Sequence, residues 1–237
     1  MPHRGDEVTD VRNRLALALD VPDLDRAEQL AKEVSPWFGV AKVGLELYSA
    51  AGPEAIARMR ALDLEVFADI KLHDIPTTVG RAARVFGRQG VRYLNFHAAG
   101  GVEMLRAGVE GLAEGTADAG DAPAIPIAVT VLTSDADARA FDERLARAIE
   151  AGCGGVVCSV EEVERVHARR PDFLTIVPGV RFADGALHDQ ARVGTPERVA
   201  RAGGNLLVLG RAVTGADDPR TAAQRVSDAV VNALTDD

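Results

Sequence analysis

Charged residues crowd the end of an apolar run near position 70. The segment FADIKLHDIPTT spans residues 67–78 and places Asp69, Lys71 and Asp74 within six positions. The residues just before it, LEV at 64–66, begin an ordinary buried β-strand. Charges this dense at the end of a buried strand cost desolvation free energy unless they are paired or take part in chemistry. This segment is therefore the first candidate for a functional site.

Lysine is rare in this chain, which makes its positions informative. Of 27 basic residues, 24 are arginine and only Lys32, Lys42 and Lys71 are lysine. An ammonium group is a compact charge that can release its proton, whereas a guanidinium group effectively cannot. A genome that favours arginine codons leaves lysine mainly where arginine cannot substitute. Because Lys42 and Lys71 fall at predicted strand ends, both are candidates for proton chemistry.

Short apolar runs alternate with amphipathic helical patterns along the whole chain. The predicted strands are residues 15–19, 40–44, 64–70, 91–96, 125–132, 155–159, 174–178 and 206–210. Predicted helices include residues 25–34, 79–89, 138–151 and 196–202, and residues 114–124 read as a polar loop.

Eight strand–helix units in 237 residues predict an α/β fold, a (β/α)8 TIM barrel, as a single domain. We expect this domain to span residues 1–237, with residues 1–12 as an N-terminal extension. A doubly wound open sheet is the alternative. It is less favoured because no G-x-G-x-x-G pattern follows the first strand and no Walker A pattern occurs.

A barrel would bring scattered polar residues to one rim, because TIM-barrel function sits at the carboxyl ends of the strands. The residues at or near such predicted ends are Asp20, Lys42, Asp69, Lys71, His97, Thr133, Ser134, Gly210 and Arg211.

Side chains alternate along a strand, so we expect Asp69 and Lys71 to share one face, roughly 6.6 Å apart. The opposite face, which packs under the helices, would then carry Leu64, Val66, Ala68 and Ile70. A purely structural alternative is an ion-pair network that closes the top of the barrel. For Asp74 alone, a helix N-cap just before Pro76 is a further alternative.

Composition narrows the classes of partner and location. The net charge is −9 and the pI is about 5.1, which argues against nucleic acids and acidic membrane surfaces as general partners. The first residues carry no apolar signal region, and no stretch is long and apolar enough for a membrane span. Cys153 and Cys158 do not form a CxxC pair, so we expect buried thiols and a cytoplasmic location.

The pattern D-x-K-x-x-D-I-P-x-T at residues 69–78 resembles the signature of the orotidine 5′-phosphate decarboxylase family, bacterial type. The similarity extends over nearly the whole chain, through LALDVPD, KVGLEL, NFHAAGG, VTVLTS, VPGVRF, HDQARVGTP and LLVLGRAVTGADDP. The resemblance implies decarboxylation of orotidine 5′-phosphate to UMP and CO2, the last step of de novo pyrimidine biosynthesis. It also implies that neither a metal nor an organic cofactor is needed.

The resemblance further implies roles for individual residues. Lys71 would donate a proton to C6 of the pyrimidine, while Lys42 and Asp69 hold Lys71 in place and Asp69 lies near the departing carboxylate. Asp74 and Thr78 would reach the neighbouring subunit's site, which makes the active form a homodimer.

The remaining implied roles concern substrate binding. Asp20 would bind the ribose hydroxyls, and Thr133 the pyrimidine, with Ser134 as the alternative. At the phosphate end the resemblance implies Arg181, Gln190, Gly210 and Arg211, with the loop at residues 180–195 closing as a lid. His97 is expected to be a hydrogen-bonded rim residue rather than a base.

Two other functions stay open at this point. One is a Mg²⁺-dependent sugar-phosphate decarboxylase or synthase with a D-x-K-x-x-D core, such as a keto-gulonate-phosphate decarboxylase or a hexulose-phosphate synthase. The other is a non-enzymatic barrel that binds a phosphorylated ligand. The IPTT residues and the HDQARVGTP loop favour orotidine 5′-phosphate.

Overall fold

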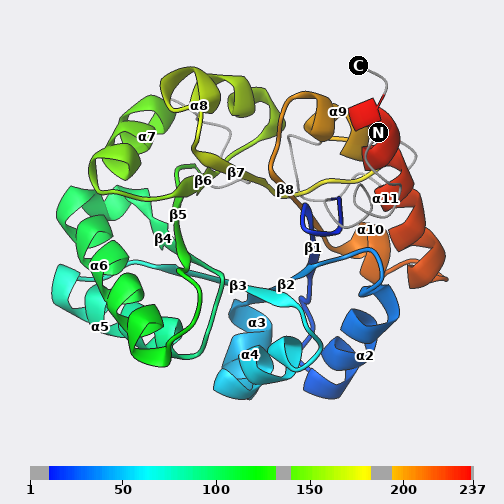
Figure 1. Ribbon diagram of the computed structural model, residues 1–237, viewed down its shortest axis with the longest axis horizontal. Coiled ribbons are helices and arrows are strands. Elements are labelled where there is room, and N and C mark those ends of the chain that lie inside the picture. Colours follow the sequence, from blue (N-terminus) through cyan, green and yellow to red (C-terminus); the bar gives the residue numbers. More distant parts are fainter. Residues whose placement is uncertain (1–10, 132–139, 183–193, 236–237) are drawn as a thin grey trace.

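Parallel strands close into a barrel in the order of the sequence, with helices on the outside (Figure 1). The computed structural model describes residues 11–131, 140–182 and 194–235. Its strands are β1 (Leu15–Ala18), β2 (Val40–Gly44), β3 (Glu65–Leu72), β4 (Tyr93–His97), β5 (Ile125–Val129), β6 (Gly155–Val157), β7 (Leu174–Val177) and β8 (Leu206–Leu209). Pairing of β1 with β8 closes the ring. The predicted TIM barrel is confirmed, and the open sheet is wrong.

Helices connect successive strands and cover the outside of the ring. They are α2 (Leu24–Val34), α3 (Leu45–Ala51), α4 (Pro53–Arg60), α5 (Pro76–Arg88), α6 (Gly101–Ala119), α7 (Phe141–Glu150), α8 (Val163–Arg169), α9 (Pro196–Arg201), α10 (Arg211–Thr214) and α11 (Pro219–Thr235). Two short 3-10 turns, η1 (Ala98–Gly100) and η3 (Val160–Glu162), follow β4 and β6. No helix within these described ranges is both long and apolar enough to span a membrane.

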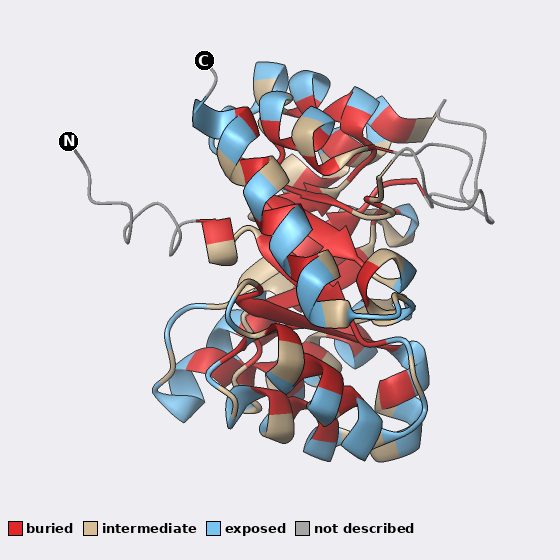
Figure 2. Cartoon of the chain, turned by 90° about the vertical axis from the view of Figure 1, so that its right-hand side faces the viewer, coloured by how far each residue is buried: buried red, intermediate tan, exposed pale blue. Residues whose placement is uncertain are grey.

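The core has two layers, one inside the ring and a larger one between the strands and the helices (Figure 2). Phe67 belongs to the inner layer, whereas its neighbours Val66 and Ala68 belong to the outer one. Ile70 packs against the outer layer. The predicted alternation of β3 is therefore confirmed up to Ala68, and Asp69 lies on the face that points into the barrel mouth.

Strand β3 runs two residues beyond its predicted end because its backbone is irregular. Its pairing with β4 shifts register between Ala68 and Leu72. Within this irregular stretch Lys71 has a φ of 54°, in the left-handed region. A residue with a side chain loses about 1–2 kcal/mol in that conformation. Simple period-2 alternation, which assumes a regular strand, does not describe this end of β3.

The polar loop predicted at residues 114–124 is wrong over its first half, because α6 continues to Ala119 and ends at the left-handed Gly120. The apolar face of α6 continues through Leu112 and Thr116, both buried. Gly115 is a point of close contact between α6 and α5. A Cβ built there would lie 2.0 Å from the carbonyl oxygen of Arg84 in α5.

The two cysteines are buried and free, as predicted. Burial raises the pKa of the Cys153 thiol to about 12 and that of the Cys158 thiol still further. Both thiols are therefore protonated and unreactive at neutral pH.

The close approach of α5 and α6 predicts that Gly115→Ala lowers stability. In a free helix this change would add about 1 kcal/mol of helix propensity. Here the added methyl group meets backbone atoms of Arg84, so we expect the free energy of unfolding to fall by about 1–3 kcal/mol in urea denaturation. Ala113→Gly, at an exposed position of the same helix, measures the propensity effect alone. A Gly115→Ala protein more stable than wild type would contradict the close contact.

Candidate active site

Four charged side chains from three neighbouring strands form an alternating chain at the rim of the barrel. Nζ of Lys42 lies 2.9 Å from Oδ1 of Asp20 and 3.3 Å from Oδ2 of Asp69. Nζ of Lys71 lies 2.6 Å from Oδ1 of Asp69. The order is therefore Asp20, Lys42, Asp69, Lys71, and each lysine contacts a carboxylate. The sequence predicted that these four residues come together, and the geometry agrees.

Parallel pairing of the first three strands brings these residues together. Lys42 stands opposite Ala18 on one side and Phe67 on the other, so it points inward between β1 and β3. Gly44, at the end of β2, leaves the space that the charges occupy. A Cβ built on Gly44 would lie 3.0 Å from Oδ1 of Asp20 and 3.2 Å from Nζ of Lys42.

Exposure rises towards both ends of the charged chain. The side chains of Lys42 and Asp69 are 9% and 16% exposed, whereas those of Lys71 and Asp20 are 34% and 59% exposed. The inner pair is thus fixed by burial and ionic contacts. The Lys71 ammonium is held by Asp69 and still reaches the open mouth of the barrel, as a group that meets a ligand must.

The inner pair stays ionised although it is buried. Burial works against the positive charge of Lys42, but the carboxylates of Asp69 and Asp20 outweigh burial and raise the pKa of Lys42. Burial likewise disfavours the charge of Asp69. The charges of Lys42 and Lys71, and hydrogen bonds from Lys71 and Asn95, outweigh it and lower the pKa of Asp69. At neutral pH the site therefore presents fixed charges, which can stabilise charge that develops on a bound molecule.

Asn95 is a polar member of this cluster that sequence reasoning did not single out. It lies within β4, is fully buried, and donates a hydrogen bond of 2.7 Å from its side-chain amide to Oδ1 of Asp69. The available signal was an amide in the middle of an otherwise apolar strand, since buried polar groups need partners.

His97 ends β4 and lies at the rim. Its Nδ1 accepts a hydrogen bond of 3.2 Å from the backbone N–H of Ala99, and its ring stacks on that of His73 with centroids 5.3 Å apart. Burial, together with the nearby charges of His73, Arg144 and Lys71, lowers the pKa of His97. The prediction of a hydrogen-bonded rim residue is confirmed.

Asp74 and Thr78 lie beyond the end of β3 and are exposed, Asp74 just before α5 and Thr78 in its first turn. The N-cap of α5 is Ile75, and Pro76 is the first helical residue, so the alternative that Asp74 caps the helix is wrong. Within the described ranges, the Asp74 carboxylate accepts a hydrogen bond of 2.7 Å from the Ile75 N–H and makes no ion pair. The geometry leaves this carboxylate outside the cluster of its own chain.

The residues predicted for the phosphate end follow two adjacent strands. Arg181 comes after β7, and Gly210 with Arg211 comes directly after β8. The backbone N–H of Arg181 donates to the carbonyl of Gly194 at 3.1 Å, which joins the two ends of the intervening loop. Arg211 is exposed and begins α10. Thr133, Ser134 and Gln190 lie outside the described residues.

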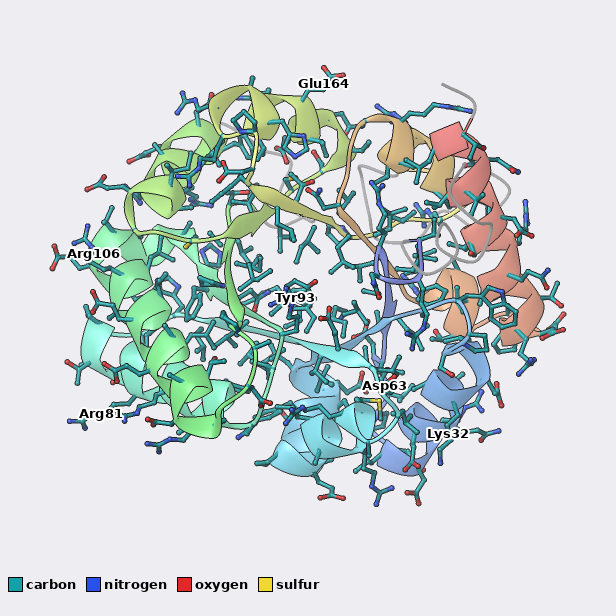
Figure 3. All side chains as sticks on the ribbon, in the orientation of Figure 1. Lys32, Asp63, Arg81, Tyr93, Arg106 and Glu164 are labelled. Atoms are coloured by element: carbon teal, nitrogen blue, oxygen red, sulfur yellow. The ribbon has the colours of Figure 1, made fainter. Side chains whose placement is uncertain are left out.

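The side chains inside the ring of strands contrast with those of the outer helices. Tyr93 from β4 lies inside the ring of strands, whereas Arg81 and Arg106 point outward from α5 and α6 (Figure 3). Ion pairs on that outer surface, such as the pair of Arg84 with Asp118 at 2.9 Å, are exposed and contribute little. The cluster at the barrel mouth combines burial, alternating charge and access to solvent.

Comparison with known proteins gives consistent matches over most of the chain. The curated orotidine 5′-phosphate decarboxylase of Moorella thermoacetica is 44% identical over 230 residues, covering 91% of each chain. That of Anaeromyxobacter dehalogenans is 46% identical over 228 residues, covering 90% of this chain and 96% of the relative.

A solved structure of similar shape bears the same name. The crystal structure of orotidine 5′-phosphate decarboxylase from Lactobacillus acidophilus superposes with a TM-score of 0.77 at 31% identity, covering 92% of this chain and 99% of that one. An uncharacterized conserved protein from Geobacillus kaustophilus gives the same TM-score of 0.77 at 32% identity, covering 91% and 99%.

The family profile itself matches residues 13–226, which include the whole barrel from β1 to β8. The chain therefore belongs to the orotidine 5′-phosphate decarboxylase / HUMPS family.

Proposed function

We propose that this protein is a carboxy-lyase that converts orotidine 5′-phosphate to UMP and CO2, the last step of de novo pyrimidine biosynthesis. The observation that carries the proposal is the alternating chain of Asp20, Lys42, Asp69 and Lys71 at the barrel mouth. It is supported by relatives at 44% and 46% identity that bear this name.

In the proposed reaction the bond from C6 of the pyrimidine to the carboxylate breaks, and the electron pair stays on C6. No neighbouring group of the ring absorbs that pair, so the protein must stabilise the negative charge. The Lys71 ammonium, which reaches the mouth of the barrel, lowers the energy of the developing charge and then transfers a proton to C6. The neutral Lys71 regains its proton from solvent.

Asp69 and Lys42 act on Lys71 in this scheme. Asp69 accepts from Lys71 at 2.6 Å and is itself anchored by Lys42 at 3.3 Å. The Asp69 carboxylate also faces the substrate carboxylate and repels it. At an effective dielectric constant near 20, one such contact at about 4 Å is worth on the order of 4 kcal/mol. Enzymes lower barriers by about 8–23 kcal/mol, so charge stabilisation and positioning carry most of the effect.

Binding at the far ends of the substrate supplies the positioning. We assign Asp20, the most exposed member of the chain, to the ribose hydroxyls and Arg181, Gly210 and Arg211 to the phosphate. TIM barrels often bind phosphate at the loops after strands seven and eight, where these three residues lie. Binding energy from that remote phosphate can orient the ring against Lys71. Thr133 or Ser134 at the pyrimidine, and Gln190 at the phosphate, remain predictions.

We further propose that the active form is a homodimer in which Asp74 and Thr78 act in the partner's site. Three features support this assignment. The Asp74 carboxylate has no ion pair within the described part of its own chain, and both residues are exposed. Ile75 and Leu45, which follow the neighbouring strands β3 and β2, are 66% and 56% exposed, an apolar surface that a second copy would cover.

The Mg²⁺-dependent sugar-phosphate enzymes are the less favoured function. The carboxylates of Asp20 and Asp69 already contact lysine ammonium groups, which compete with a cation for the same oxygens. No cluster of three His, Cys, Asp or Glu side chains suited to a metal ion occurs in the described ranges. We propose a single barrel domain at work in the cytoplasm, a location that two free buried thiols favour.

Lys71→Ala is expected to lower kcat by at least about 10⁴-fold, because it removes both the proton donor and the charge that stabilises the carbanion. The loss of absorbance as orotidine 5′-phosphate turns over measures this, in buffer that contains EDTA. Affinity for UMP should change far less. Lys32→Ala is the matched control, since Lys32 lies on α2 and pairs with Glu28. Near-normal turnover by Lys71→Ala would remove the proposed acid, and a wild type that needs Mg²⁺ would favour the sugar-phosphate alternative.

Arg211→Ala should weaken UMP binding by roughly 10- to 150-fold. This range corresponds to the loss of one hydrogen bond to a charged group, which contributes about 1.5–3 kcal/mol. Uridine, which lacks the phosphate, should lose much less. Titration calorimetry with both ligands measures the difference, and Arg106→Ala on the outer face of α6 is the control. Equal losses for UMP and uridine would mean that Arg211 does not hold the phosphate.

A mixture of two inactive variants tests the shared site. In a dimer of one Lys71→Ala chain and one Asp74→Ala chain, one of the two sites has a native Lys71 and receives a native Asp74 from its partner. Equal mixing after dissociation makes about half of the dimers mixed, so about a quarter of wild-type activity should return. If Asp74 serves its own chain, no mixed site is complete and no activity returns.

A further inference from the structure

The irregular end of β3 places three of its residues opposite a single residue of β4. The register pairs Ala68 with Leu94 and then Leu72 with Phe96. Residues 69–71 of β3 therefore all face one position of β4, which is Asn95. In a regular parallel pair the backbone hydrogen bonds would continue through this stretch. Across this bulge one residue of β4 stands opposite three residues of β3, so the regular pattern of backbone hydrogen bonds is interrupted.

The side chain of Asn95 makes one contact with the backbone of β3 and a second with the Asp69 carboxylate. Its Oδ1 accepts a hydrogen bond of 2.6 Å from the backbone N–H of Lys71, the residue in the left-handed conformation. Its Nδ2 donates at 2.7 Å to Oδ1 of Asp69, the oxygen that also accepts from Nζ of Lys71 at 2.6 Å. One amide therefore touches both the backbone of Lys71 and the carboxylate that holds the end of its side chain.

The two contacts fix the amide in one orientation, because a backbone N–H needs an acceptor and a carboxylate needs a donor. Asn95 has no exposed surface, so water does not replace either contact. A proton donor requires a rigidly held position of this kind, since a misplacement of about 1 Å costs about 100-fold in rate. At neutral pH the amide of asparagine offers an acceptor and a donor side by side at this length, whereas an ionised aspartate offers acceptors alone.

We propose that Asn95 is a positioning residue for the decarboxylation, which sets the position of the Lys71 ammonium through both the Lys71 backbone and the Asp69 carboxylate. This inference rests on the proposed function. Asn95 does not need to touch the substrate, and it acts entirely through the two residues that do.

Two substitutions separate the contacts. Asn95→Leu keeps the branching and the number of side-chain heavy atoms and removes both hydrogen bonds. Asn95→Asp keeps the acceptor for the Lys71 N–H but puts a second carboxylate against Asp69. We expect each variant to lower kcat by about 100-fold at pH 8, because the ammonium moves away from C6. Affinity for UMP, which needs no proton, should change by less than about threefold.

The pH profile distinguishes positioning from a general loss of structure. A protonated carboxyl group introduced by Asn95→Asp can donate to Asp69 as the amide did. The charged groups that face this position are Asp69 and Lys71 from β3 and Lys42 from β2, with His97 further along β4. The kcat of Asn95→Asp relative to wild type should therefore rise as the pH falls from about 8 to 5. For Asn95→Leu this ratio should stay constant.

Asn205 gives the matched control. Its Oδ1 also bridges neighbouring strands, accepting from both the backbone N–H and Oγ1 of Thr175 at 2.8 Å, but at the opposite end of the barrel. Asn205→Leu should lower thermal stability and leave kcat within about threefold of wild type. If Asn95→Leu and Asn95→Asp also stay within threefold of wild-type kcat, the positioning role is overturned.

Failure of this inference is distinguishable from failure of the proposed function. A wild type that does not decarboxylate orotidine 5′-phosphate refutes the function alone. In that case carbon NMR still tests the hydrogen bond from Asn95 to Asp69. It follows the pKa of the Asp69 carboxyl group in wild type and in Asn95→Leu. A raised pKa in the variant supports the hydrogen bond from Asn95, and an unchanged pKa overturns it. Asn95→Asp keeps the test available if Asn95→Leu does not fold.

Discussion

The Asp69 carboxylate shared between two ammonium groups is the interaction on which the site depends. Its Oδ2 faces Lys42 at 3.3 Å and its Oδ1 faces Lys71 at 2.6 Å, so removal of this carboxylate would leave two positive charges close together. A buried carboxylate tolerates desolvation only when such partners compensate for it. Because each partner lies on a different strand, the charge balance also links β2 to β3.

The barrel makes this arrangement possible because its apolar core provides the stability and its charged rim provides the chemistry. The apolar layers inside the ring and under the helices hold the strands. The charges at the rim compensate for one another's desolvation, and the rigid backbone beneath them holds them in position. The regular part of β3 belongs to the core, and its irregular end, with the left-handed Lys71, belongs to the site.

Sequence reasoning succeeded where one local rule decides the outcome. Strand β2 was predicted at its observed bounds, and the alternation along β3 placed Val66 and Ala68 outside the ring and Asp69 inside. Prediction from local patterns failed where contacts between residues distant in the sequence decide the structure. Residues 114–119 are helical and pack on α5, and Gly115, which would weaken a free helix, allows that close packing.

The sequence by itself determined the fold class, the family and the four charged residues of the rim, because strand periodicity and the D-x-K-x-x-D spacing are local and specific. Only the tertiary structure decided which oxygen meets which ammonium, how far Lys71 is exposed, and that Asn95 belongs to the site. The physical reason is that hydrogen bonds and burial depend on the register between strands. The shift of β3 against β4 is a property of the folded pair, and neither strand's sequence contains it alone.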